Sequence, residues 1–466
     1  MRLKPVCASI ILLGLSGTAF AATNSNVDVQ NQLNTMQSQI NSMQQVINQN
    51  NGMTQSGGGT ALQQRLASCP NWYDSISVSG LINVDGILSS RRADFIGLTE
   101  GPTVEPYFGD RSASDLALDN ADLFVDAQVN SWTKAHIGIN YQNNNNNYTD
   151  DNPKSPSSVT DNGSNVNNSL IIKPWMGSLI DEAYVTFGDF CRSPIYFRVG
   201  KQYLNFGNYD RFATVPTFTQ LLSQTNETAA TLGFVSNGFY GSVYGFRGIP
   251  SVTDNESTLG GSGHYYGQTV NVNNWGANLG WSMKNQDSSL NLQVGYLNNM
   301  ADVDYVSASG DQFGLGNGNS LTASGYTYSV GAVSVDASGS LGMFDAYVHY
   351  VGAIDNFAPA DVNPELNTSG VNGAEPQALV VGAGITTDIA NHKSRFGLDY
   401  QYSWESEFVG LYGIPEARAE ATFDMSVNKN VNVGLYVYHD QDDSLSDGGT
   451  GRGSTTGVLH LGVMFA

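Results

Sequence analysis

The chain has 466 residues, 42 of them acidic and 20 basic, and its formal net charge is −22. This balance excludes a nucleic-acid-binding protein, which needs a basic surface. Aromatic residues make up 11% of the sequence, whereas acidic disordered chains are poor in them, so we expect a folded protein.

The first 21 residues are typical of a secretory signal peptide. Arg2 and Lys4 precede a short apolar run from Val6 to Leu15, and residues 19–21 read Ala-Phe-Ala, a small-residue cleavage site. The apolar run is too short for a transmembrane helix, and no later stretch is long enough to be one. We therefore expect an exported protein without helical membrane spans.

Residues 22–51 have the heptad spacing of a coiled coil. The apolar positions, spaced alternately four and three residues apart, are Val29, Leu33, Met36, Ile40, Met43 and Ile47. Such a segment favours self-association, and a homotrimer is one possible assembly; a single amphipathic helix is the alternative. Residues 52–70 follow as a Gly-rich linker and a short helix.

From Ile76 onward the hydrophobic period changes to two, which predicts β-strands with one apolar and one polar face. The clearest examples are residues 76–88, 122–130, 290–296, 396–404, 418–425 and 455–466. Many runs have nine or more residues, the length of a strand that crosses a bilayer at a tilt. The connections alternate between short and long, and eight long and seven short ones join sixteen strands. Residues 71–466 are therefore predicted to form an all-β transmembrane barrel in the bacterial outer membrane, with lipopolysaccharide around it and the N-terminal segment in the periplasm.

Two cysteines remain after removal of the signal peptide, Cys69 and Cys191. An even number of cysteines in an oxidising compartment predicts a disulfide, and both residues lie at the short-turn end of the predicted barrel. Two free thiols are the alternative.

The sequence offers little support for catalysis. It contains neither an HExxH nor a CxxC motif, and we find no Ser-His-Asp arrangement, metal site or cofactor site. We therefore expect a non-enzymatic protein. An outer-membrane hydrolase and a structural envelope tether stay open as less favoured alternatives.

One segment reverses the charge of the chain. From Cys191 to Pro250 there are five basic residues and only two acidic ones. On the strand predicted at about 195–204, alternation turns Arg198 toward the lumen. The same alternation would turn Lys201 toward lipid, so we expect a β-bulge at Gly200 that turns Lys201 inward; extension of Lys201 to the membrane surface is the alternative.

The loop after this strand, Asn205 to Ala230, is the third long connection. The predicted barrel resembles sixteen-stranded porins, in which this loop folds inward and narrows the pore, so we expect a constriction here. The predicted pore or ligand residues are Arg198, Lys201, Tyr209, Arg211 and Arg247, and the predicted constriction residues are Asn205, Phe212 and Phe218. A basic constriction selects anions through its local field. The alternative is that the five basic residues are scattered among the rim, the lipid interface and ion pairs.

Two short stretches carry a resemblance to a known family. Together with the signal peptide and the coiled-coil segment, residues 181–188 (DEAYVTFG) and 200–207 (GKQYLNFG) resemble the LbtU-type siderophore porins of Legionella-like bacteria and the related iron-uptake outer-membrane proteins of Francisella. The resemblance implies uptake of a ferric siderophore, an anionic polycarboxylate, through a barrel without an energy-coupling plug domain. A general anion-selective porin is the alternative.

Overall fold

The computed structural model describes residues 75–90, 112–141, 180–190, 192–248, 272–285, 287–307, 329–358, 373–406, 414–444 and 451–465. The predicted signal peptide, coiled coil and linker lie outside these residues, as do Cys69 and Cys191. None of the described helices is long and apolar enough to cross a bilayer.

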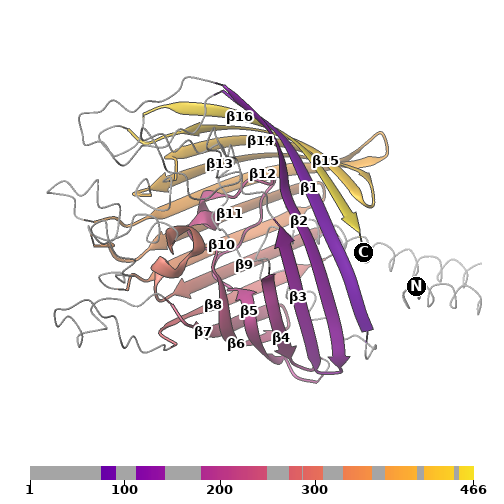
Figure 1. The fold of residues 1–466 in the computed structure, drawn as a ribbon, viewed down its shortest axis with the longest axis vertical. Helices are drawn as coiled ribbons and strands as arrows, with labels where there is room; N and C mark the ends of the chain where they lie inside the picture. The colour runs from indigo at the N-terminus through magenta and orange to yellow at the C-terminus, as the bar shows by residue number, and fades with distance from the viewer. Residues whose placement is uncertain are drawn as a thin grey trace, which may run out of the picture. The chain divides into compact units, whose positions relative to one another are not determined.

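The described chain forms a closed antiparallel β-barrel in which each strand pairs with its neighbours in sequence (Figure 1). The strands are β1 (Ser75–Ser89), β2 (Ala113–Asn130), β3 (Thr133–Tyr141), β4 (Ile180–Phe187), β5 (Ile195–Tyr203), β6 (Asn226–Ser236), β7 (Phe239–Phe246), β8 (Asn274–Lys284), β9 (Ser288–Leu297), β10 (Ala332–Leu341), β11 (Phe344–Ala353), β12 (Gln377–Ile389), β13 (His392–Trp404), β14 (Ala417–Asn428), β15 (Val431–Gln441) and β16 (Gly453–Phe465). The prediction of sixteen antiparallel strands is confirmed.

Closure depends on the pairing of the first strand with the last. Ten residues of β1, from Gly80 to Ser89, pair with β16, from Phe465 back to Thr456. Phe465, the penultimate residue, is directly opposite Gly80, where an added Cβ would lie 2.3 Å from its ring. The ring therefore needs a glycine opposite it.

Alternation along the strands produces an apolar exterior. In β5, Ile195, Phe197 and Val199 are exposed, whereas Tyr196 and Arg198 are buried, as the sequence pattern predicted. The predicted last strand behaves in the same way, with Leu459, Leu461, Val463 and Phe465 all exposed. The inward positions instead carry many polar side chains.

Several inward tyrosines lie directly across from a glycine. The cross-strand pairs are Tyr196 with Gly233, Tyr240 with Gly280, Tyr244 with Gly276, and Tyr347 with Gly382. In each pair an added Cβ on the glycine would lie 2.2–2.4 Å from an atom of the tyrosine ring. The glycines let these rings lie flat along the wall, so large side chains cover the inner face without extending across it.

The bulge that we predicted at Gly200 is absent. Residues Ala183 to Phe187 pair with Lys201 to Phe197 without a register shift, and β6 pairs with the other edge of β5 without one. Lys201 therefore keeps its outward position. Its ammonium group donates a hydrogen bond to the backbone carbonyl of Ile180, 2.9 Å away at the start of β4. The long stem thus carries the charge toward the end of the barrel that bears the long connections, which is the alternative that we left open.

We predict that Gly200 is needed for its backbone conformation. Its φ is +133°, and an added Cβ would lie 2.2 Å from the carbonyl oxygen of Ala183. The Gly200→Ala variant should lose about 1–3 kcal/mol of stability. The measurement is the denaturant midpoint of tryptophan fluorescence for the protein in lipid vesicles. Gly457→Ala on β16 is the control, because no atom lies within 4 Å of its added Cβ; equal losses in both variants would contradict the prediction.

Candidate functional site: the loop inside the barrel

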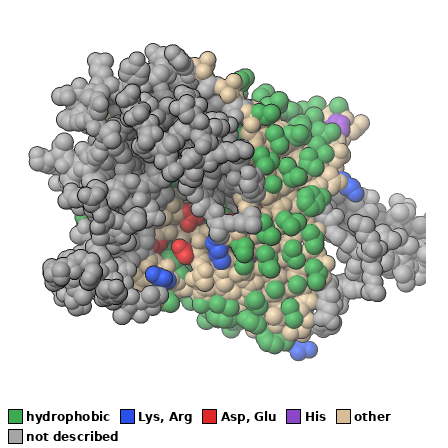
Figure 2. Space-filling view, viewed as in Figure 1, with side chains coloured by type: hydrophobic (Ala, Val, Ile, Leu, Met, Phe, Trp, Pro, Cys, Tyr) green, Lys and Arg blue, Asp and Glu red, His purple; other side chains and the backbone are tan. Residues whose placement is uncertain are grey.

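The exterior of the barrel is the surface of a membrane-spanning protein. Large hydrophobic side chains are exposed along the outward positions of the strands, among them Leu232, Leu279, Leu398 and Leu435. Figure 2 shows this apolar cover on one face, where charged side chains are few. Such an extended apolar surface around a polar interior requires hydrocarbon outside. The fold therefore defines a sixteen-stranded transmembrane β-barrel.

The connection from β5 to β6, Leu204–Thr225, lies inside this barrel and is called the inner loop below. Nearly all of its residues are buried. Strand β6 begins at Asn226, five residues earlier than we predicted, so the loop is shorter than Asn205 to Ala230. The inward fold itself is present in the structure.

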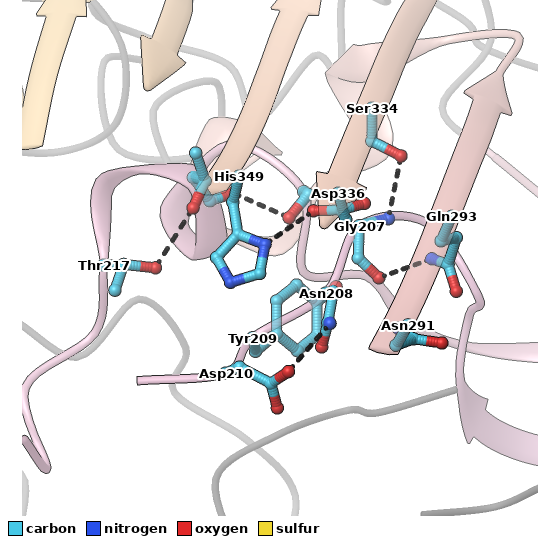
Figure 3. Close-up of polar contacts among 12 residues, drawn as sticks. Gly207, Asn208, Tyr209, Asp210, Thr217, Asn291, Gln293, Ser334, Asp336 and His349 are labelled. Carbon is cyan, nitrogen blue, oxygen red and sulfur yellow. Dashed lines mark hydrogen bonds and ion pairs between the residues drawn. The ribbon is translucent and has the colours of Figure 1, made fainter. Parts of the chain in front are cut away.

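The first part of the inner loop is held against β9 and β10 by hydrogen bonds to its backbone (Figure 3). The N–H of Gly207 donates to Ser334 Oγ at 3.2 Å, and Gln293 Nε2 donates to the carbonyl of Gly207 at 3.0 Å. Gly207 has a φ of +82°, and an added Cβ would lie 2.7 Å from Ser223 Oγ. A glycine is thus required where the loop turns onto the wall.

A buried Asp–His pair lies beside this attachment. Asp336 on β10 and His349 on β11 are direct cross-strand partners, and their Oδ1 and Nδ1 atoms are 3.0 Å apart. Figure 3 shows both side chains next to the loop residues Asn208, Tyr209 and Asp210. The same cross-strand arrangement occurs twice more on the inner wall, between Asp126 and His136 at 2.8 Å and between Asp85 and His460 at 2.7 Å.

The second part of the inner loop reaches the wall formed by β13 to β16 and β1. Ala213 and Val215 pack in one apolar cluster with Ile87, Tyr436, Tyr438 and Val458. Arg418 on β14 donates to the carbonyl of Pro216 at 3.2 Å, and the backbone N–H of Phe218 donates to Gln401 Oε1 at 2.9 Å. The short helix α4 (Phe218–Leu221) follows, with Thr217 as its N-cap. The loop therefore crosses the lumen and is fixed on both sides.

The structure places six of the eight predicted residues on the inner loop or on the inner wall of β5. Arg198 is buried on the inner wall of β5, and Arg211 lies on the loop itself, where Nη1 donates to Gln220 Oε1. Asn205 Nδ2 donates to Ser242 Oγ at 2.9 Å. Burial lowers the pKa of Arg211 to about 10, partly offset by Glu420, so the residue remains a cation at neutral pH.

The aromatic residues of the loop serve its packing. Tyr209 is 1% exposed and donates to the carbonyl of Phe206, so it does not line a solute path as we predicted. Phe212 packs on Tyr347 with ring centroids 4.8 Å apart, and Phe218 is fully buried. Burial also raises the pKa of the Tyr209 hydroxyl well above its usual range.

Two predicted pore residues are outside the lumen. Lys201 faces outward, as described above, and Arg247 is exposed just after β7, one position beyond the buried Phe246. Side chains alternate between the two faces of a strand, so two residues that are neighbours in sequence cannot both point into the lumen. Charge excess along the sequence therefore overestimated the number of basic groups in the lumen.

Two arginines that sequence reasoning missed lie against the loop. Arg395 on β13 pairs with Asp345 at 3.1 Å, and its Cζ is 4.2 Å from the centroid of Phe212. Arg418 pairs with Asp440 through two nitrogens, at 2.6 and 3.0 Å. Inward parity on the strand predicted at 418–425 was the signal that could have found Arg418. Arg395 lies before the strand predicted at 396–404, because β13 begins earlier, at His392. Among the described residues no group of His, Cys, Asp and Glu could hold a metal ion.

The connection from β9 to β10 supports the inner loop from one side. Its 3-10 helix η2 (Met300–Asp302) and residues Val303, Tyr305 and Val306 belong to the apolar cluster that contains Leu221 and Leu222. Asp304 accepts a hydrogen bond from the N–H of Asn226 at 3.0 Å, and its own N–H donates to the carbonyl of Gln224 at 2.9 Å. These bonds fix the end of the inner loop.

The chain was compared with known proteins. No family model matches the sequence. It is 27% identical over 385 residues to a UPF0422 protein of Legionella pneumophila strain Lens, which covers 77% of this chain and 63% of that protein. A UPF0422 protein of Coxiella burnetii is 24% identical over 370 residues, with 78% and 67% covered. The chain thus spans less than two thirds of the length of its Legionella relatives.

The solved structures that it resembles are outer-membrane channels at low identity. The Pseudomonas putida protein OprB is 12% identical, with 87% of this chain and 96% of that one covered and a TM-score of 0.49. The Acinetobacter baumannii outer-membrane channel DcaP is also 12% identical, with 85% and 99% covered and a TM-score of 0.46. An anion-selective porin from Comamonas acidovorans is 10% identical, with 84% and 100% covered and the same score.

We predict that Arg418 holds the second part of the inner loop. The Arg418→Gln variant removes the buried ion pair with Asp440, a change that costs about 3–5 kcal/mol in comparable sites. Hydrogen exchange at residues 213–222 should accelerate while the strands stay protected. Arg192→Gln is the control, since Arg192 is largely exposed and pairs with Asp189 in a short turn. Unchanged exchange in the Arg418 variant would show that the apolar contacts suffice.

We also predict that the β9–β10 connection binds the inner loop more tightly at low pH. Burial, together with Glu227 and Asp181, raises the pKa of Asp304 from 3.8 to about 8. Between pH 4 and pH 8 the folded state thus binds more protons than the unfolded chain. The stabilising contribution is complete below pH 4 and is lost as the pH rises through 8. Protection factors at residues 300–307 should therefore fall between pH 6 and 9, and Asp304→Asn should abolish this dependence. A wild-type profile that is flat across this range would contradict it.

Proposed function

We propose that the protein is a channel of the bacterial outer membrane, through which a small solute crosses the barrel without an energy-coupling plug domain. The observation that carries this proposal is the inner loop, which is attached to β9 and β10 on one side of the lumen and to β13 and β14 on the other. A loop fixed in this way narrows a barrel of sixteen strands, which otherwise encloses an aqueous lumen. The apolar exterior supports the membrane location.

We propose an anionic polycarboxylate as the solute, namely the ferric siderophore that the family resemblance implies. Arg198 on β5 and Arg211 on the inner loop are the basic groups that support this choice. The relatives from Legionella agree with the genus of the resembling family, although their names specify no substrate. A general anion-selective porin has the same requirements and remains the first alternative.

A specific observation favours a second candidate, a channel that prefers cations. Among the described residues, the buried charged side chains include seven carboxylates and two arginines. They are Asp85, Asp119, Asp122, Asp302, Asp336, Asp399 and Glu420, with Arg198 and Arg418. An inner wall with this balance attracts cations unless the carboxylates are neutralised by protons or by their partners.

The proposed topology has the seven short turns in the periplasm and the long connections outside the cell, as in other bacterial outer-membrane barrels. Residues 22–51 would then lie in the periplasm, where a coiled coil can hold a homotrimer together. A disulfide between Cys69 and Cys191 would tie this segment to the barrel. Both remain proposals for residues outside the described part of the chain.

We predict that reversing one charge on the inner loop changes both selectivity and uptake. Arg211→Glu should shift the reversal potential in planar bilayers toward cations. It should also lower uptake of radiolabelled ferric polycarboxylate siderophore about tenfold, because the local field at the constriction changes sign. The matched control is Arg247→Glu, which changes the same charge at an exposed position outside the lumen.

Each outcome separates the candidates. Anion preference in the wild type and loss of iron uptake in the Arg211 variant alone support the siderophore channel. Anion preference without siderophore uptake supports the general porin. Cation preference with unchanged uptake favours the second candidate, and absence of conductance would leave the hydrolase or the envelope tether.

A further inference from the structure

The inner wall of β2 to β5 carries a stack of aromatic and basic side chains. The rings of Phe124 and His136 are 5.9 Å apart, and those of His136 and Tyr184 are 4.9 Å apart, both nearly parallel. The guanidinium carbon of Arg198 lies 4.4 Å from the centroid of Tyr184 and 5.8 Å from that of Tyr196. Arg198 is therefore held between two tyrosine rings.

Strand register builds this stack. His136 on β3 is the direct cross-strand partner of Tyr184 on β4, and Arg198 on β5 is the partner of Thr186, two residues further along β4. Tyr196 can lie flat against the wall because Gly233 is opposite it. The side chains of the stack thus come from inward positions that the strand register places next to one another.

Arg198 is bonded differently from the other two arginines on the inner wall. Its Nε donates to Thr186 Oγ1 at 3.1 Å, which fixes the plane of the guanidinium group. Within the described part of the chain, no carboxylate lies at ion-pair distance from Arg198, and its buried Nη2 has no hydrogen-bond acceptor. Arg395 and Arg418, in contrast, each have a carboxylate at ion-pair distance, Asp345 and Asp440, although Nε of Arg395 also makes no hydrogen bond.

A buried guanidinium N–H without an acceptor is costly, so an acceptor from a solute would be bound strongly there. The basic group on the other face of Tyr184 does not compete for it. His136 is already matched by Asp126 at 2.8 Å and by Glu182 at 3.7 Å. The uncompensated positive charge of the stack is therefore that of Arg198.

We propose that Arg198, held between Tyr184 and Tyr196, is a binding site for a carboxylate group of a small solute. The planar fork of a guanidinium matches a carboxylate, and the two rings exclude water from its faces. The proposal rests on the channel function above, because the solute must reach this wall from the lumen. It adds a specific position on β5, separate from the inner loop.

The test is calorimetric titration of the full-length protein in detergent with citrate, and separately with inorganic phosphate. Citrate should bind the wild type, and Arg198→Gln should weaken binding about tenfold or more, as expected for loss of a charge-assisted hydrogen bond. Arg198→Lys keeps the charge but not the fork, so it should also weaken binding. Arg192→Gln is the control and should leave the affinity within about twofold, since Arg192 is largely exposed and pairs with Asp189 in a short turn away from the stack.

Several results would overturn the proposal. They are no citrate binding to the folded wild type, unchanged affinity in both Arg198 variants, equal loss in the Arg192 control, or phosphate binding as tightly as citrate. Because the titration needs no ion current, it also separates this site from the channel itself. A wild type that conducts but does not bind citrate refutes the site alone, and one that binds citrate but does not conduct refutes the channel alone.

Discussion

The structure depends on closing the sheet. In hydrocarbon, every backbone N–H and C=O group must find a partner within the protein, and an open sheet would leave two unpaired edges. The ten-residue pairing of β1 with β16 removes both edges at once. Each strand then has a neighbour on either side, and alternation assigns every side chain either to lipid or to the interior.

This assignment determines what the interior can contain. The inward side chains must cover a concave wall, and the tyrosine–glycine pairs do so with rings that lie along it. The inner loop brings further backbone polar groups into this space, and these also need partners. Ser334, Gln293, Gln401 and Arg418 supply them from different strands. A loop that crosses the lumen is thus possible because the wall is polar at defined positions.

The sequence predicted the fold well because strand alternation is a local property. Sixteen strands, their order and the inward direction of Arg198 follow from period two and from connection lengths. The site was less predictable because it depends on contacts between distant residues. Phe212 meets Arg395, and Pro216 meets Arg418, across more than 180 positions in the sequence. At Gly200 the predicted β-bulge was wrong. The glycine is required by its positive φ, and the strand pairing contains no extra residue there.

The sign of the field in the lumen depends on pairing more than on the number of charges. Three inward carboxylates, Asp85, Asp126 and Asp336, each face a histidine across the ladder. Each of these carboxylates therefore has a hydrogen-bond partner on the neighbouring strand. Arg395 and Arg418 are likewise matched by Asp345 and Asp440. The charges of these pairs act on a solute less strongly than a charge without an opposite charge nearby. Arg198, with no carboxylate at ion-pair distance among the described residues, is such a charge.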